Sequence, residues 1–154
     1  MDKSARILVV DDDEDIRKVL ETILGDEGYI VESVDTAKKA IERSEKNFYN
    51  LVLIDVRLPD MEGIELLTKM RDTTPKMRKI IITGYPTLQN AIAAVNKGAD
   101  AYVMKPFDME KVLQIIKDEL MNQKKEKKYN EEKVAEFIET RVKELEAKNK
   151  LCKK

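Results

Sequence analysis

The sequence has no histidine, no tryptophan and only one cysteine, and aromatic residues make up 5% of its 154 residues. Without histidine, the chain cannot use imidazole as a general base or as a metal ligand. The single cysteine, Cys152, excludes an internal disulfide and is typical of a reducing compartment. No apolar run approaches the roughly 20 residues of a membrane span, and the N-terminal apolar stretch is too short, and its sequel too acidic, for a signal peptide. The sequence therefore predicts a cytoplasmic protein without a membrane segment.

Charge is nearly balanced overall but is distributed unevenly along the chain. The net charge is −1, from 29 basic and 30 acidic residues. Residues 123–154 hold 11 of the basic and 7 of the acidic residues, a net charge of +4, which leaves −5 for residues 1–122. An acidic body with a basic tail predicts cation binding in the body and a separate role for the tail. We therefore expect one domain over residues 1–122 and a charged helical tail over residues 123–154.

Five predicted strands alternate with amphipathic segments of helical spacing. Short apolar runs bounded by turn residues are typical of strands buried on both faces, whereas Tyr29 to Val34 is more mixed and is expected at an edge of the sheet. The strands begin near residues 5, 29, 50, 79 and 101. Strands alternating with helices predict an α/β fold, in which helices cover both faces of a doubly wound parallel sheet. Asp13 is a plausible N-cap for the first helix, and Gly28 fits its end.

Polar residues follow four of the five predicted strands. Asp11 and Asp12 end the first strand, Asp55 the third, Thr83 the fourth and Lys105 the fifth. In open parallel sheets, ligands bind outside the carboxyl ends of the strands, so these groups are expected to meet at one edge. Singly, each has an ordinary explanation as a turn, cap or surface residue. Their joint occurrence at strand ends favours a shared site.

The residue types at this edge suit phosphoryl transfer to a carboxylate. Three close carboxylates repel one another and need a cation, and an all-oxygen set with room for water suits Mg²⁺. Lys105 offers a mobile charge that can balance Asp55 or an anion added to it, and Thr83 offers a hydroxyl donor. Such transfer depends mostly on positioning and charge neutralisation.

Four segments resemble the signature segments of a response-regulator receiver domain. They read ILVVDDDEDIRKVL, LVLIDVRLPDMEG, IIITGYPT and GADAYVMKPF, and the resemblance covers residues 4 to 122. It implies a three-layer, flavodoxin-like fold with the strand order 2-1-3-4-5. It also implies a two-component signalling protein that takes a phosphoryl group from a phosphohistidine on a cognate histidine kinase or phosphotransfer protein.

The resemblance assigns roles to residues of the metal and acceptor site. It implies that Asp55 is the phosphoacceptor and also contacts Mg²⁺. Asp12 would be the main carboxylate ligand of the ion, with Asp11 holding it partly through water. The backbone carbonyl of Arg57 would be the third protein ligand.

The resemblance also implies a switch. Thr83 and Lys105 would contact the phosphoryl oxygens, and the Lys105–Pro106 peptide would be cis. Tyr102 would turn inward when Thr83 moves toward the phosphate, which alters the face formed by the fourth helix, fifth strand and fifth helix. Tyr85 and Arg57, two places after Thr83 and Asp55, would hinder the water that hydrolyses the phosphoryl group.

Two other functions are compatible with parts of this pattern. Aspartate-nucleophile phosphatases also form an aspartyl phosphate, but they resemble Asp-x-Asp, and Arg57 stands at the second position. A degenerate receiver that acts only as a binding module would lack some of the five polar residues found here. A receiver is an enzyme only in catalysing its own phosphorylation and dephosphorylation. Nothing resembles a helix-turn-helix, so direct DNA binding is not expected.

The tail carries a short apolar repeat. Ala135, Ile138, Val142 and Leu145 are spaced 3, 4 and 3 apart, with Asn149 and Cys152 next in register. A fresh helix could begin at Asn130, or the fifth helix could simply continue. The stripe is expected to pack on the receiver or to pair with a second copy. The second alternative predicts a homodimer through the tail and the fourth-helix, fifth-strand, fifth-helix face.

Overall fold

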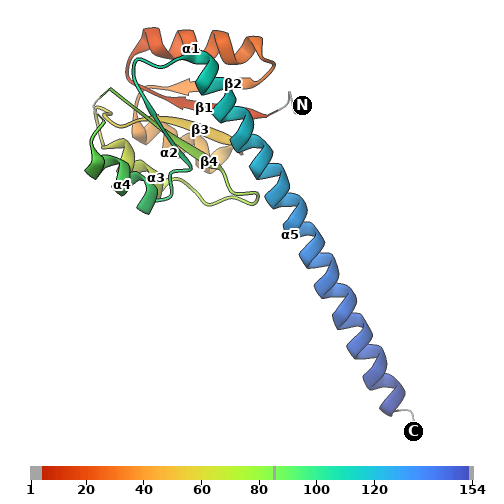
Figure 1. Cartoon of the computed structure of the whole chain (residues 1–154). Coiled ribbons are helices and arrows are strands. Elements are labelled where there is room, and N and C mark those ends of the chain that lie inside the picture. Colours follow the sequence, from red (N-terminus) through yellow and green to blue (C-terminus); the bar gives the residue numbers. More distant parts are fainter. Residues whose placement is uncertain (1–4, 85, 153–154) are drawn as a thin grey trace.

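The computed structural model describes residues 5–84 and 86–152 and contains five parallel strands alternating with five helices. Figure 1 shows the sheet between two layers of helices. The elements are β1 (Arg6–Val10), α1 (Glu14–Asp26), β2 (Ile30–Val34), α2 (Ala37–Lys46), β3 (Leu51–Asp55), α3 (Gly63–Lys69), β4 (Arg78–Thr83), α4 (Leu88–Asn96), β5 (Ala101–Met104) and α5 (Met109–Cys152).

The sheet order is β2-β1-β3-β4-β5, and every pair of neighbouring strands is parallel. Side chains alternate between the two faces, so each strand feeds two apolar clusters. Leu8 and Val10 join the cluster under α2, α3 and α4, whereas Ile7 and Val9 join the cluster under α1 and α5. This arrangement confirms the predicted three-layer fold and explains why the central strands β1 and β3 are almost entirely apolar, whereas the edge strand β2 includes Glu32 and Ser33.

The ends of α1 follow the predicted capping chemistry. The Asp13 side chain accepts hydrogen bonds from the backbone N–H groups of Asp15 and Ile16, which otherwise lack partners inside the helix. After the helix, Gly28 has φ of +95°, a left-handed conformation that glycine adopts without a Cβ clash. These two residues fix where α1 starts and stops above β1.

Helix α4 covers the sheet with its small residues. Leu88, Ile92 and Val95 are apolar and lie at helical spacing on α4, but their exposed fractions are 77%, 51% and 66%. Ala94 is the buried residue of this helix. Helical spacing identified the element, but it did not indicate which side faces the core.

Helix α5 runs without a break from Met109 to Cys152, so no fresh helix starts at Asn130. Figure 1 shows its second half leaving the domain as a single rod. Buried Gln123 anchors the helix, because its Nε2 donates to the carbonyls of Asn50 and Lys76, both at 2.9 Å. One turn further on, Glu126 pairs with Arg78. Among the described residues, no helix is long and apolar enough to cross a membrane.

Candidate functional site

Three carboxylates lie together at the carboxyl edge of the sheet. Asp11 and Asp12 directly follow β1, and Asp55 is the last residue of β3, which neighbours β1. One oxygen from each carboxylate lies within 4.8 Å of the others. Asp11 is buried and Asp12 exposed, while Asp55 lies between these extremes. The site therefore has a buried inner wall and an open side toward solvent.

Lys105 contacts two of these carboxylates from the loop after β5. Its Nζ lies 3.1 Å from Oδ2 of Asp11 and 3.4 Å from Oδ2 of Asp55. Burial raises the pKa of Asp55, and the nearby Asp11 charge raises it further, while Lys105 opposes both effects. Burial alone would lower the pKa of Lys105, but the two carboxylates outweigh it and the pKa is raised. The ammonium group is thus held charged between the two acids.

Backbone groups hold the carboxylates in place. Oδ1 of Asp11 accepts from the backbone N–H of Asp13 at 2.9 Å, and Nη1 of Arg17 donates to the Asp11 carbonyl at 2.7 Å. Oδ1 of Asp55 accepts from the backbone N–H of Arg57 at 3.3 Å. Each acid is therefore oriented by a turn of its own strand end, which leaves its other oxygen for the shared site.

The remaining predicted residues lie on β4 and β5. Thr83 ends β4 and is buried, and its carbonyl accepts from the backbone N–H of Lys105 at 2.7 Å. The Lys105–Pro106 peptide is cis, as expected. Tyr102 packs against the cluster under α2, α3 and α4, and within the described residues its buried hydroxyl has no hydrogen-bond partner. Tyr85 lies outside the described residues.

The loop after β3 contains two residues whose roles the sequence did not reveal. Gly63 begins α3 and donates its N–H to the Val56 carbonyl at 2.6 Å, so the helix starts directly against the end of β3. The Asp60 carboxylate accepts from the N–H groups of Ala37 and Lys38, each at 2.9 Å, at the start of α2. Gly63 follows a Pro-Asp turn, and a glycine at such a place indicates a close approach of two backbone segments. No local sequence pattern indicates that Asp60 contacts the start of α2.

The chemistry of this donor set fits a hard divalent cation. The open side of the cluster gives a small ion access to carboxylate oxygens from two strands, and such oxygens suit Mg²⁺. The lysine beside them supplies a positive charge for an anion. The arrangement is suited to receiving a phosphoryl group on a carboxylate.

Comparison with known proteins matches this arrangement. The family model described as "Response regulator receiver domain" matches residues 7–117. The regulatory protein AtoC of Escherichia coli is 32% identical over 79% of this chain and 26% of its own length. The response regulator ArlR of Staphylococcus saprophyticus is 35% identical over 77% of this chain and 53% of its own length. The chain thus spans about a quarter to a half of these curated relatives.

Solved structures show the same fold over most of the chain. A CheY-like receiver domain protein from Methanospirillum hungatei is 47% identical, with a TM-score of 0.77, over 80% of this chain and 98% of that one. The beryllofluoride-activated NtrC4 receiver domain dimer is 33% identical, with a TM-score of 0.72, over 77% of this chain and 98% of that one. By fold, edge geometry and sequence, the chain belongs to the response-regulator receiver family of two-component systems.

Proposed function

We propose that Asp55 is the residue that accepts the phosphoryl group, and that the donor is a phosphohistidine on a cognate histidine kinase or phosphotransfer protein. The observation that carries this proposal is the contact of Lys105 with both Asp55 and Asp11 at the edge of the sheet. Asp55 sits at the end of a central strand, half-buried but open on one side. An attacking carboxylate needs that combination of fixed position and access.

In the proposed step, a carboxylate oxygen of Asp55 attacks the phosphorus atom. A new P–O bond forms while the P–N bond to the donor imidazole breaks, and the imidazole nitrogen leaves with the electron pair of that bond. The charge on the transferred group falls on its three outer oxygens. Lys105 lies beside the acceptor oxygen and neutralises part of this charge. Thr83, at the end of the neighbouring strand, supplies the hydroxyl donor.

The receiver family binds Mg²⁺ at its acidic pocket. For this chain, we propose which groups would bind the ion. Asp11, Asp12, Asp55 and the backbone carbonyl of Arg57 would hold the ion. When bound, Mg²⁺ neutralises the carboxylate cluster and the incoming phosphoryl oxygens. Asp12 is the most exposed of the three acids, so it suits an ion arriving from solvent.

The proposed output is a conformational switch on the α4–β5–α5 face. Tyr102 and Thr83 would couple this switch to the phosphoryl group. The Tyr102 hydroxyl is buried and, within the described residues, has no hydrogen-bond partner, so a rotation of the ring would allow this polar group to find one. We also propose a homodimer through this face and the tail, which the dimeric NtrC4 receiver supports by analogy. AtoC is a regulatory protein of greater length, of which this chain covers 26%. A cytoplasmic location and the lack of direct DNA binding stay predictions.

The test is incubation with acetyl phosphate and Mg²⁺, followed by intact-mass measurement. The proposal predicts one added phosphoryl group on the wild type and none on the Asp55→Asn variant, which keeps the size of the side chain. A degenerate receiver would gain no mass under any condition. A phosphatase would turn over added phosphomonoesters steadily, which the proposal excludes. Undiminished phosphorylation of the variant would remove Asp55 from the acceptor role.

A further inference from the structure

An apolar stripe on the second half of α5 is open to solvent. Ile138, Val142 and Leu145 are 55%, 47% and 48% exposed, and Ala135 and Asn149 extend the same face at both ends. Their spacing keeps one side of the helix apolar over two heptads. No described segment of the chain covers this side beyond Ile138. Within the described part of the chain, the stripe is thus a helix face without a partner inside one copy.

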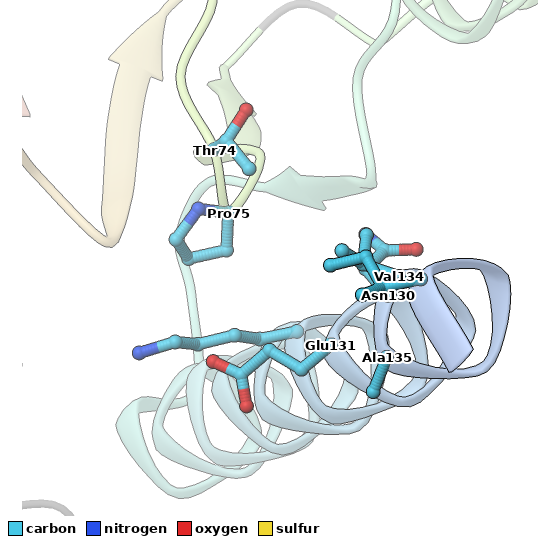
Figure 2. Close-up of a pocket in the computed structure, with 8 residues that line it drawn as sticks. Thr74, Pro75, Asn130, Glu131, Val134 and Ala135 are labelled. Carbon is cyan, nitrogen blue, oxygen red and sulfur yellow. The ribbon is translucent and has the colours of Figure 1, made fainter. Parts of the chain in front are cut away.

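At its receiver end, the stripe opens into a groove. The groove has a volume of about 500 Å³ and separates α5 from the loop that carries Thr74 and Pro75. Figure 2 shows Pro75 across from Val134 and Ala135 of the helix. The groove leaves space beside the first turns of the stripe. Ala135 and Ile138, which line the groove, are therefore exposed at the receiver end of the stripe.

The helix is held at one end only. Gln123 and Glu126 tie it to the sheet, and from residue 127 to 149 every side chain is exposed. This segment extends for about 33 Å at 1.5 Å per residue. In proteins, most of the stability of an amphipathic helix comes from packing of its apolar face, and this segment lacks such packing within the described residues. Packing against another helix would supply that stability.

The charges beside the stripe distinguish between the two orientations of a paired helix. With Val142 and Asn149 at a and Leu145 at d, the e positions are Glu132, Glu139 and Glu146, and the g positions include Arg141 and Lys148. A parallel pair brings Arg141 of each copy next to Glu146 of the other. An antiparallel pair would instead place Glu139 opposite Glu146, and Arg141 opposite Lys148. Opposite charges meet only in the parallel arrangement.

The side chains at a and d point to the same arrangement. A β-branched residue at a with leucine at d favours two strands, and a buried asparagine at a fixes register. Val142, Leu145 and Asn149 fulfil these conditions. Within one copy Arg141 pairs with Glu144 at 3.0 Å, but both side chains are more than half exposed. Such surface pairs are weak, so Arg141 is available to a second copy.

We infer that two copies pair through residues 135–149 of α5 as a parallel two-stranded coiled coil, with Arg141 of each copy facing Glu146 of the other. This inference deepens the proposed homodimer and rests on it, but it does not depend on the phosphoryl chemistry. It names the second copy, the orientation and the residues that set the register.

The orientation is tested by reversing charges in the full chain. Sedimentation equilibrium is measured with and without beryllofluoride and Mg²⁺ for the wild type, Arg141→Glu, Glu146→Arg and the double variant. Each single change should weaken the dimer by about tenfold, because two attractive pairs become repulsive, and the double variant should regain most of the affinity. Glu136→Arg, at an outer b position whose ion pair is with Lys133, is the matched control and should leave the affinity unchanged.

Other results would overturn the inference. Stronger dimers from both single variants would indicate antiparallel pairing, since each change then replaces a like-charge contact with an attractive one. A monomeric wild type in both states, or a dimer indifferent to both changes, would exclude the tail as the interface. Acetyl phosphate uptake of each variant is measured in parallel. Normal uptake by a chain that does not pair would reject the inference alone, whereas a paired chain that takes up no phosphate would reject the proposed function alone.

Oxidation of the only cysteine gives an independent readout. Cys152 continues the repeat at a d position, so a parallel pair brings Cys152 of the two copies together. An antiparallel pair centred on the stripe would hold them about 25 Å apart. Mild oxidation should therefore yield a covalent dimer with wild-type protein at micromolar concentration and much less with Ile138→Ser/Val142→Ser. Equal yields from both proteins would contradict the pairing.

Discussion

Gly63 and Asp55 are in contact through their backbones at the edge of the sheet. A Cβ atom added to Gly63 would lie 2.1 Å from the carbonyl oxygen of Asp55 and 2.9 Å from Cγ2 of Ile54. Contacts this short are not tolerated, so any side chain at Gly63 has to displace the end of β3. The close packing of α3 on β3 therefore depends on glycine, and it positions the proposed acceptor.

Replacing Gly63 with alanine should displace Asp55 from Lys105 and Asp11. We expect phosphorylation by acetyl phosphate to slow at least tenfold and stability to fall by roughly 1–3 kcal/mol, as for other overpacked sites. Gly25→Ala is the matched control, because no atom lies within 4 Å of the added Cβ in α1, and its activity should be unchanged. A Gly63→Ala variant that phosphorylates at the wild-type rate would show that this contact does not position Asp55.

Removing the charge of Asp12 should stabilise the protein in the absence of metal. Asp11, Asp12 and Asp55 repel one another, and Lys105 pairs with only the first and last of them. Asp12→Asn should therefore raise the melting temperature in EDTA. Mg²⁺ at ten times its Kd should stabilise the wild type by about 1.4 kcal/mol and the variant by much less. Melting curves indifferent to millimolar Mg²⁺ would count against the metal site.

Replacing Lys105 with methionine should have the opposite effect on the metal-free protein. The buried Asp11 and half-buried Asp55 would lose their shared counter-charge, at a cost of about 1–2 kcal/mol. Mg²⁺ should recover much of this loss, since it supplies positive charge to the same oxygens. Chemical denaturation with and without Mg²⁺ checks both effects. The variant should also fail to switch when it is phosphorylated.

The protein should lose stability between about pH 10 and 12 because of Tyr49. Burial, followed by the hydrogen bond to Glu32, raises the pKa of Tyr49 from 10.0 to about 12. The folded state then keeps a proton that the unfolded chain loses above pH 10, so unfolding becomes easier as the pH rises through this window. Tyr49→Phe should remove this part of the pH dependence and cost about 1 kcal/mol at pH 7.

Tyr129→Phe is the control for this experiment, because Tyr129 is 59% exposed on the tail. Its stability should follow the wild type at every pH. An unaltered alkaline decline in Tyr49→Phe would assign that decline to other groups.

Much of the fold was predictable because its central strands β1, β3 and β4 are buried on both faces and its acids stand at strand ends. Asp11, Asp55 and Lys105 could be brought together from the sequence alone, since parallel strands share one carboxyl edge. Contacts between elements could not be predicted from the sequence in this way. Lys79 reads as an ordinary residue at the start of β4, yet it is buried and its Nζ donates to the Leu67 carbonyl at 2.6 Å. The role of Gly63 likewise depends on how closely α3 packs on β3, which no local pattern encodes.

The most direct test of the central claim is to locate the phosphoryl group. After phosphorylation by acetyl phosphate with Mg²⁺, borohydride reduces an aspartyl phosphate to homoserine, and peptide mass spectrometry identifies the changed residue. If Asp55 is the acceptor, homoserine appears at position 55 and at no other acid of the Asp11, Asp12 and Asp55 cluster. Homoserine at position 11 or 12, with position 55 unchanged, would contradict it.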